Sequence, residues 1–209
     1  MESMRNRAKD MFPMVLLTLL SIVQALALEF LWDHTRNRTD LFELSVSVIP
    51  GWLQIAATFN IIIIIWLMYA GLLMRFRWTP TTADSIFPFL VGMIQFLMID
   101  LMGSENFALW IIILALAFGA LVAIDHMAMR RARKDEANHE FFCRYSPATI
   151  RDFVPQIILV VVLLAAGGWI GLTNHHGWFT VSVLVGIFVG LGYETHRTAS
   201  FWKISMGDE

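Results

Sequence analysis

Two acidic residues, Glu29 and Asp100, lie within apolar stretches of the sequence that are long enough to cross a membrane. An ionised side chain inside a bilayer is unfavourable unless it is paired or faces water. Acids in such positions therefore mark an ion pathway, or they pair with a neighbouring helix for structural reasons. The sequence leaves both interpretations open for these two residues.

Small and polar residues accompany Glu29 on one face of the first apolar stretch. At 100° per residue, five positions fall on a single stripe, with Leu28 beside it. A stripe of this kind lines a water-filled path, or it lets another membrane helix approach closely. Gln24 lies off the stripe, and we expect it to pair with a neighbouring helix. The stripe residues are Thr18, Ser21, Ala25, Glu29 and Trp32.

Acidic residues also gather on one predicted side of the membrane. Only Arg36 and Arg38 oppose them there, which makes this side net negative. The acids form an outer vestibule that concentrates cations, or they are solvated cap and loop residues. The candidates for the vestibule are Asp33, Asp100 and Glu105.

The whole chain has the composition of an integral membrane protein. It is 57% hydrophobic and 15% charged, whereas soluble proteins have about 25% charged residues. Six apolar stretches predict transmembrane helices, since a helix needs about 20 apolar residues to cross a bilayer. These spans cover about 12–32, 50–74, 85–102, 107–128, 153–173 and 178–193. The expected fold is one all-α domain of six transmembrane helices over 1–209, with a basic linker at 129–152.

Proline and capping residues predict where the helices begin. Pro13 and Pro50 suit the first turns of the first two spans, and Asp84 or Ser85 suits the N-cap of the third. Segments 103–106 and 174–177 predict tight turns on the outer side, where the longer loop 33–49 also lies.

Lysine and arginine predict the orientation. Thirteen of the 15 lie in segments that six crossings place on the side of the N-terminus. Because these residues are enriched in cytoplasmic loops, we expect both termini in the cytoplasm. The predicted location is the cell membrane, crossed several times.

The sequence contains no common motif for catalysis or for cofactor binding. Glycine-rich phosphate loops and the common hydrolase motifs are missing, so we predict no enzyme activity, no cofactor and no metal site. The net charge of -2 gives no indication of nucleic-acid binding, and the lone Cys143 excludes an internal disulfide. Asp125 and His126 are the nearest approach to an acid–base pair, but adjacent residues of a helix do not face each other.

The second predicted span, with the segment before it, resembles a known family. The pattern consists of Leu41-Phe42-Glu43-Leu44, Pro50, Trp52-Leu53, Thr58-Phe59, Ile62, Trp66 and Tyr69. It is similar to the second helix of the bacterial and endolysosomal potassium channels of the transmembrane-protein-175 type, which also have six spans with both ends inside. The chain diverges at the first span, where the Phe-Ser-Asp signature of the family is absent. The resemblance implies an oligomeric cation pathway around the first span, constricted by large apolar residues on the face of Leu28 and Trp32.

Two classes of function remain open. The first is a homo-oligomeric, potassium-like channel for monovalent cations, with an apolar gate on the first helix and an acidic outer vestibule. The second is a non-conducting membrane subunit or sensor that docks a partner through the basic linker. A coupled transporter ranks below both, because no inverted repeat is visible. The pore and gate candidates are Thr18, Ser21, Ala25, Leu28, Glu29 and Trp32.

Overall fold

The computed structural model describes residues 2–43, 45–173 and 177–206, and every regular element in these residues is helical. The long helices are α1 (Glu2–Asn37), α2 (Ile49–Arg75), α3 (Thr82–Asp100), α4 (Phe107–Ala132), α6 (Val154–Thr173) and α7 (Trp178–Met206). The short ones are η1 (Thr39–Phe42), η2 (Val46–Val48), η3 (Glu136–Asn138), α5 (His139–Phe142) and η4 (Ile150–Phe153).

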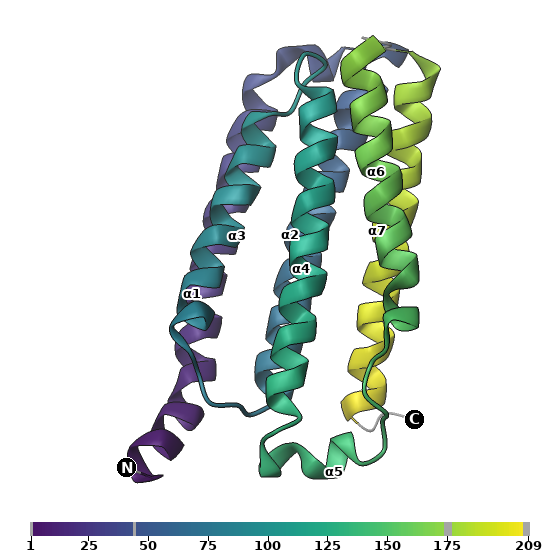
Figure 1. Ribbon diagram of the computed structural model, residues 1–209. Coiled ribbons are helices and arrows are strands. Elements are labelled where there is room, and N and C mark those ends of the chain that lie inside the picture. The colour runs from purple at the N-terminus through teal and green to yellow at the C-terminus, as the bar shows by residue number, and fades with distance from the viewer. Residues whose placement is uncertain (1, 44, 174–176, 207–209) are drawn as a thin grey trace.

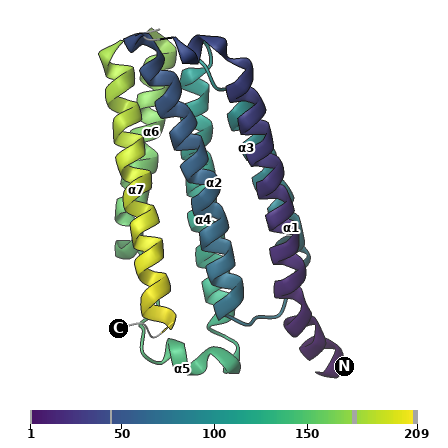
Figure 2. The ribbon, with the colours of Figure 1, turned by 180° about the vertical axis from the view of Figure 1, so that it is seen from behind.

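The long helices described here form two layers (Figures 1 and 2). One layer consists of α3, α4 and α6, and the other of α1, α2 and α7. Within the layers, α4 packs on α6 and α2 packs on α7. Across the layers, the closest packing is between α1 and α3. The two layers are therefore held together most closely at the α1–α3 edge.

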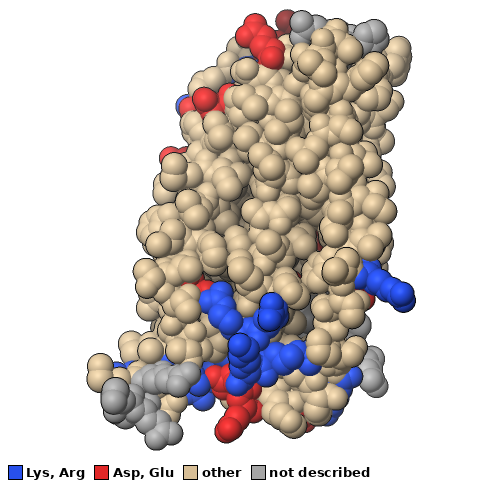
Figure 3. All heavy atoms as spheres, viewed as in Figure 1, with Lys and Arg blue, Asp and Glu red and all other residues tan. Residues whose placement is uncertain are grey.

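The helices have the length and surface of membrane spans. In the described part of the chain, six helices are long and apolar enough to cross a membrane. The face shown in Figure 3 has an uncharged middle, with charged residues gathered toward its two ends. Large apolar side chains are exposed along the outward faces of the helices. These features indicate an all-helical, multi-pass membrane protein.

Glycine allows two of the helix pairs to approach closely. A Cβ atom at Gly92 of α3 would lie 2.7 Å from Cγ1 of Val23 in α1. A Cβ atom at Gly167 of α6 would lie 3.1 Å from the carbonyl oxygen of Ala108 in α4. Membrane helices associate largely by such close packing of small residues, so these two glycines set the spacing of their helix pairs.

A buried pair of amides also joins α1 to α3. Nε2 of Gln24 donates to Oε1 of Gln95 at 3.2 Å, and Nε2 of Gln95 donates to Oε1 of Gln24 at 2.9 Å. The two side chains are only 4% and 1% exposed. The prediction that Gln24 pairs with a neighbouring helix is confirmed.

Several helices extend beyond the predicted spans, the first and the last of them furthest. The first begins at Glu2 rather than near residue 12, so Pro13 lies inside the helix and does not start it. The residues before Pro13 include strong helix formers such as Glu, Met, Arg and Ala, which carry the helix past its apolar part. The last helix likewise continues to Met206, beyond the predicted end at 193. The length of the apolar stretch sets how much of a helix can lie in the membrane, but the helix itself can continue beyond that stretch.

The N-cap of α3 is Thr81, so the prediction of Asp84 or Ser85 is wrong. Asp84 is instead the third helical residue of a capping box, where its Oδ2 accepts from the Thr81 backbone N–H at 2.7 Å and from the Thr81 hydroxyl at 2.8 Å. A carboxylate at this position reaches back to satisfy the start of the helix.

Other boundaries agree with the prediction. Pro50 lies in the first turn of α2. The chain turns between α3 and α4 at 101–106, and Gly103 adopts a positive φ of 136° there, which suits glycine. The predicted turn at 174–177 lies mostly outside the described residues.

Candidate functional site

The predicted pore stripe of α1 lies on the outside of the described bundle. Thr18, Ser21, Ala25 and Glu29 are all exposed, while the other face of α1 packs against α2 and α3. Ser21 lies at the border with α2, where its Oγ accepts a 3.4 Å hydrogen bond from Nε1 of Trp66. The stripe therefore faces away from the protomer's own core.

The two predicted gate residues have different surroundings. Trp32 exposes 65% of its surface and continues the stripe. Leu28 is half-buried and packs against the main hydrophobic core. The side chain of Leu28 thus lies at the edge of the stripe, and part of it packs within the protomer.

The predicted vestibule residues lie where α1 and α3 end, which we call the acidic end of the bundle. Asp33 forms an ion pair with Arg36 at 2.7 Å. Glu29, Asp100 and Glu105 are exposed and make no hydrogen bond or ion pair with any residue that the structure describes. The fold places these acids at one end, but it does not bond Glu29 to Asp100.

The second arginine of the acidic end is also engaged by an aspartate. Nη2 of Arg38 lies 2.5 Å from Oδ2 of Asp40. This hydrogen bond lowers the pKa of Asp40, so the carboxylate stays ionised at neutral pH. Both arginines are thus paired locally, which leaves Glu29, Asp100 and Glu105 without an ion pair to either arginine.

A cavity of about 760 Å³ lies between the two layers at the opposite end of the bundle. We call this the basic end, and it carries the start of α1, the connection 76–81 and the linker. The linker covers 133–153 rather than the predicted 129–152, because α4 continues to Ala132 and α6 begins at Val154. The walls come from α2, α4, α6 and α7, and the linker covers one side. Deep in the cavity the walls are apolar, formed by residues such as Ile64, Phe118 and Leu191. The volume falls within the range of about 300–1,000 Å³ that is common for ligand pockets.

Charged residues line the cavity near the helix ends. Five basic and three acidic side chains of the described residues contribute, which leaves a net positive lining. Basic residues also gather at this end of the molecular surface in Figure 3. The basic residues are Arg75, Arg130, Arg133, Lys134 and Arg197, and the acidic ones are Asp125, Asp152 and Glu194.

The basic residues of the cavity differ in how they are held. Arg197 forms an ion pair with Glu194 at 3.6 Å. Arg133 donates to the carbonyl oxygen of Tyr145 at 3.0 Å. Arg130 and Lys134 are exposed and make no ion pair or hydrogen bond with any described residue. These last two are therefore the cations most available to an incoming anion.

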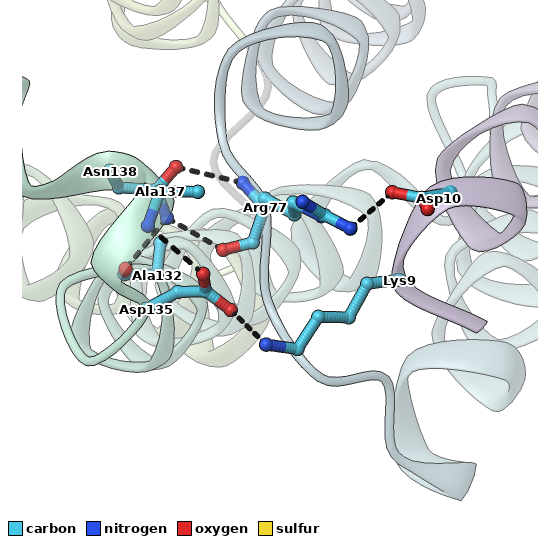
Figure 4. Close-up of polar contacts among 7 residues, drawn as sticks. All are labelled: Lys9, Asp10, Arg77, Ala132, Asp135, Ala137 and Asn138. Carbon is cyan, nitrogen blue, oxygen red and sulfur yellow. Dashed lines mark hydrogen bonds and ion pairs between the residues drawn. The ribbon is translucent and has the colours of Figure 1, made fainter. Parts of the chain in front are cut away.

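Asn138 fixes the linker against the connection between α2 and α3 (Figure 4). Its Oδ1 accepts from the backbone N–H of Arg77 at 3.0 Å, and its Nδ2 donates to the carbonyl oxygen of Arg77 at 2.6 Å. The same Nδ2 donates to the carbonyl oxygen of Ala132 at 2.7 Å. The linker is thus a folded part of the bundle rather than a loose tether.

Two ion pairs connect this region to the start of α1 (Figure 4). Nζ of Lys9 lies 2.6 Å from Oδ2 of Asp135, and Asp10 pairs with Arg77. The hydrogen bond from Lys9 lowers the pKa of Asp135. The charges predicted to lie in the cytoplasm therefore join three separate segments of the chain.

The sequence does not reveal this cavity, because its charged residues come from segments that are far apart in the chain. Asp125 and His126 both line it. His126 contacts the ring of Phe153 edge-on, with ring centroids 5.0 Å apart. The one signal of the cavity in the sequence is the number of basic residues in the linker and at the adjacent helix ends, which also indicates orientation and partner docking.

Comparison with known proteins gives no match to any family model, to any curated protein or to any solved structure. The resemblance to the transmembrane-protein-175 channels therefore stays a prediction from the residues of α2 and the segment before it.

Proposed function

We propose that the chain is the subunit of a homo-oligomeric, potassium-like cation channel whose α1 helices surround the axis. The observation that carries this proposal is the exposure of Glu29 and its polar stripe on the outside of the bundle. A carboxylate that faces acyl chains is unfavourable, whereas one that faces water or another subunit is not. Assembly around α1 removes the stripe from lipid without any change in the fold of the protomer.

The acidic end supports a pathway for cations. Arg36 and Arg38 are already paired with aspartates, and Glu29, Asp100 and Glu105 make no ion pair or hydrogen bond with a described residue. Uncompensated carboxylates at a pore mouth raise the local concentration of cations. In the proposed orientation this end lies outside the cell, and the basic end lies in the cytoplasm.

The proposed gate is a ring of apolar side chains from α1. Leu28 and Trp32 are the candidates, and the face of Leu28 that does not pack on the core borders the stripe. A narrow ring without polar atoms excludes water and stays closed until it widens. An added polar group should therefore hydrate the ring and increase conduction.

Potassium flux into liposomes tests the proposal. The purified protein should carry flux down a potassium gradient, and Leu28→Asn should increase it. The matched control is Leu26→Asn, because Leu26 is exposed on α1 but lies away from the stripe. An assembled oligomer that carries no flux, or equal effects of the two substitutions, would refute the channel.

A second candidate is a non-conducting membrane subunit or sensor. It is favoured by the linker, which is folded onto the bundle and lines the cavity at the basic end. This function requires a ligand or partner at the linker and no flux, so the liposome measurement separates the two candidates.

A further inference from the structure

We propose that the cavity at the basic end binds one anionic phospholipid, with the phosphate at Arg130 and Lys134 and an acyl chain between the two layers. The proposal rests on the chemistry of the cavity wall. It holds whether the protein conducts ions or not.

The cavity has two chemically distinct parts. The part between the layers is lined by apolar side chains of helices that are apolar enough to span a membrane, including Ile64, Phe118 and Leu191. The part near the helix ends is lined by a surplus of basic residues. A ligand that satisfies both parts needs a negatively charged group joined to an apolar chain.

The cationic part can bind an anion, because two of its basic residues make no bond to a described acidic residue. Arg130 and Lys134 line the cavity, are exposed, and bond to no described residue. Arg130 lies in the last turn of α4 and Lys134 lies in the turn that follows it, and both line the same cavity. Two adjacent cations at the membrane surface bind a phosphate group by charge.

The apolar part favours a lipid over a soluble anion. A small phosphate compound would neutralise the cations but leave the apolar walls in contact with water. An acyl chain covers these walls and removes them from contact with water. Basic pockets between membrane helices at the cytoplasmic side are known to hold anionic lipid headgroups.

The linker makes the cavity a defined site rather than a groove in the lipid-facing surface. Phe141, Phe142 and Tyr145 of the linker contribute to the lining. The three hydrogen bonds of Asn138 hold this segment in place. A lipid bound here is enclosed by protein on several sides, in contrast to the lipids that surround the bundle.

The test is a lipid titration of the purified full-length protein by native mass spectrometry. Dioleoyl phosphatidylglycerol should bind more tightly than dioleoyl phosphatidylcholine, which has the same chains and no net charge. The double variant Arg130→Gln/Lys134→Gln should weaken phosphatidylglycerol binding about 30-fold, because each basic residue near the surface contributes about 1 kcal/mol.

A matched control distinguishes binding in the cavity from general electrostatic attraction of the lipid to the basic end. The double variant Arg7→Gln/Lys203→Gln removes the same charge from exposed positions at the same end, outside the cavity. It should keep the affinity of the wild type. Equal weakening in both double variants, or equal binding of the two lipids by the wild type, would overturn the proposal.

Two further measurements examine the apolar part. Val122→Phe fills the cavity wall and should weaken phosphatidylglycerol binding, whereas Val162→Phe on the exposed face of α6 should not. Glycerol 1-phosphate, which has the headgroup charge without chains, should fail to compete at the concentrations used for the lipid. Unchanged binding by Val122→Phe, or competition by glycerol 1-phosphate, would show that the site binds a phosphate group alone. Either result would overturn the proposal that the ligand is a lipid.

Discussion

Replacing one residue of the Gln24–Gln95 pair should loosen the contact between α1 and α3. Gln95→Leu removes both hydrogen bonds between the amides and leaves the Gln24 amide buried without a partner. Interhelical hydrogen bonds in membranes contribute about 0.6 kcal/mol each on average, so two of them contribute about 1.2 kcal/mol. The orphaned amide adds to this cost. We expect a loss of about 1–2 kcal/mol in the free energy of unfolding.

A double-mutant cycle isolates the pair. Gln24→Leu, Gln95→Leu and the double variant are unfolded by sodium dodecyl sulfate in mixed micelles, with helicity as the signal. The double variant leaves no orphaned amide, so the two effects should be non-additive, with a coupling energy of about 1 kcal/mol. As a control, Gln95→Leu combined with Thr18→Val should be additive, since the Thr18 hydroxyl donates to Met14 on its own helix. Additivity within about 0.3 kcal/mol for the glutamine cycle would refute the amide contact.

Three further predictions concern the rest of the bundle. Gly167→Ala should destabilise it by about 1–3 kcal/mol, since the added methyl group meets backbone, while Gly168→Ala, whose methyl group meets nothing, should have little effect on thermal unfolding. Asn138→Ala removes three hydrogen bonds and should expose the linker to limited proteolysis at neutral pH. An unchanged cleavage rate would contradict the role of Asn138 in holding the linker. The lowered pKa of Asp135 means that its ion pair with Lys9 stabilises the fold above the ordinary aspartate pKa of about 3.9 and is lost as the pH falls through the lowered value. Protection of the linker amides from hydrogen exchange, corrected for the intrinsic exchange rate at each pH, should therefore fall at strongly acidic pH in the wild type and should already be low at neutral pH in Asp135→Asn.

The sequence predicts the helices well, because their signal is local. Uncharged stretches such as the one between Pro50 and Arg75 are recognisable without any knowledge of their neighbours. The ends of the helices were less accurate. Polar residues before Pro13 continue α1, and Thr81 caps α3 because its hydroxyl and backbone reach Asp84, a choice that depends on local geometry rather than residue type.

The candidate site was only partly accessible from the sequence. Helical periodicity placed Thr18, Ser21, Ala25 and Glu29 on one face, and these residues are all exposed in the structure. Periodicity does not say which way that face points relative to the other helices. The cavity at the basic end was missed because the layers that form it bring together residues from four helices and the linker, and no local pattern encodes this arrangement.

Cysteine accessibility at α1 tests the central claim most directly. Ala25→Cys is placed on the stripe in a Cys143→Ser background, because the native thiol is exposed. A positively charged methanethiosulfonate reagent should then block potassium flux into liposomes. The matched control is Met93→Cys on α3, which is exposed but lies outside the stripe, and its flux should be unaffected. Block at Ala25→Cys alone would support an ion pathway along α1, whereas labelled Ala25→Cys protein with unchanged flux would contradict it.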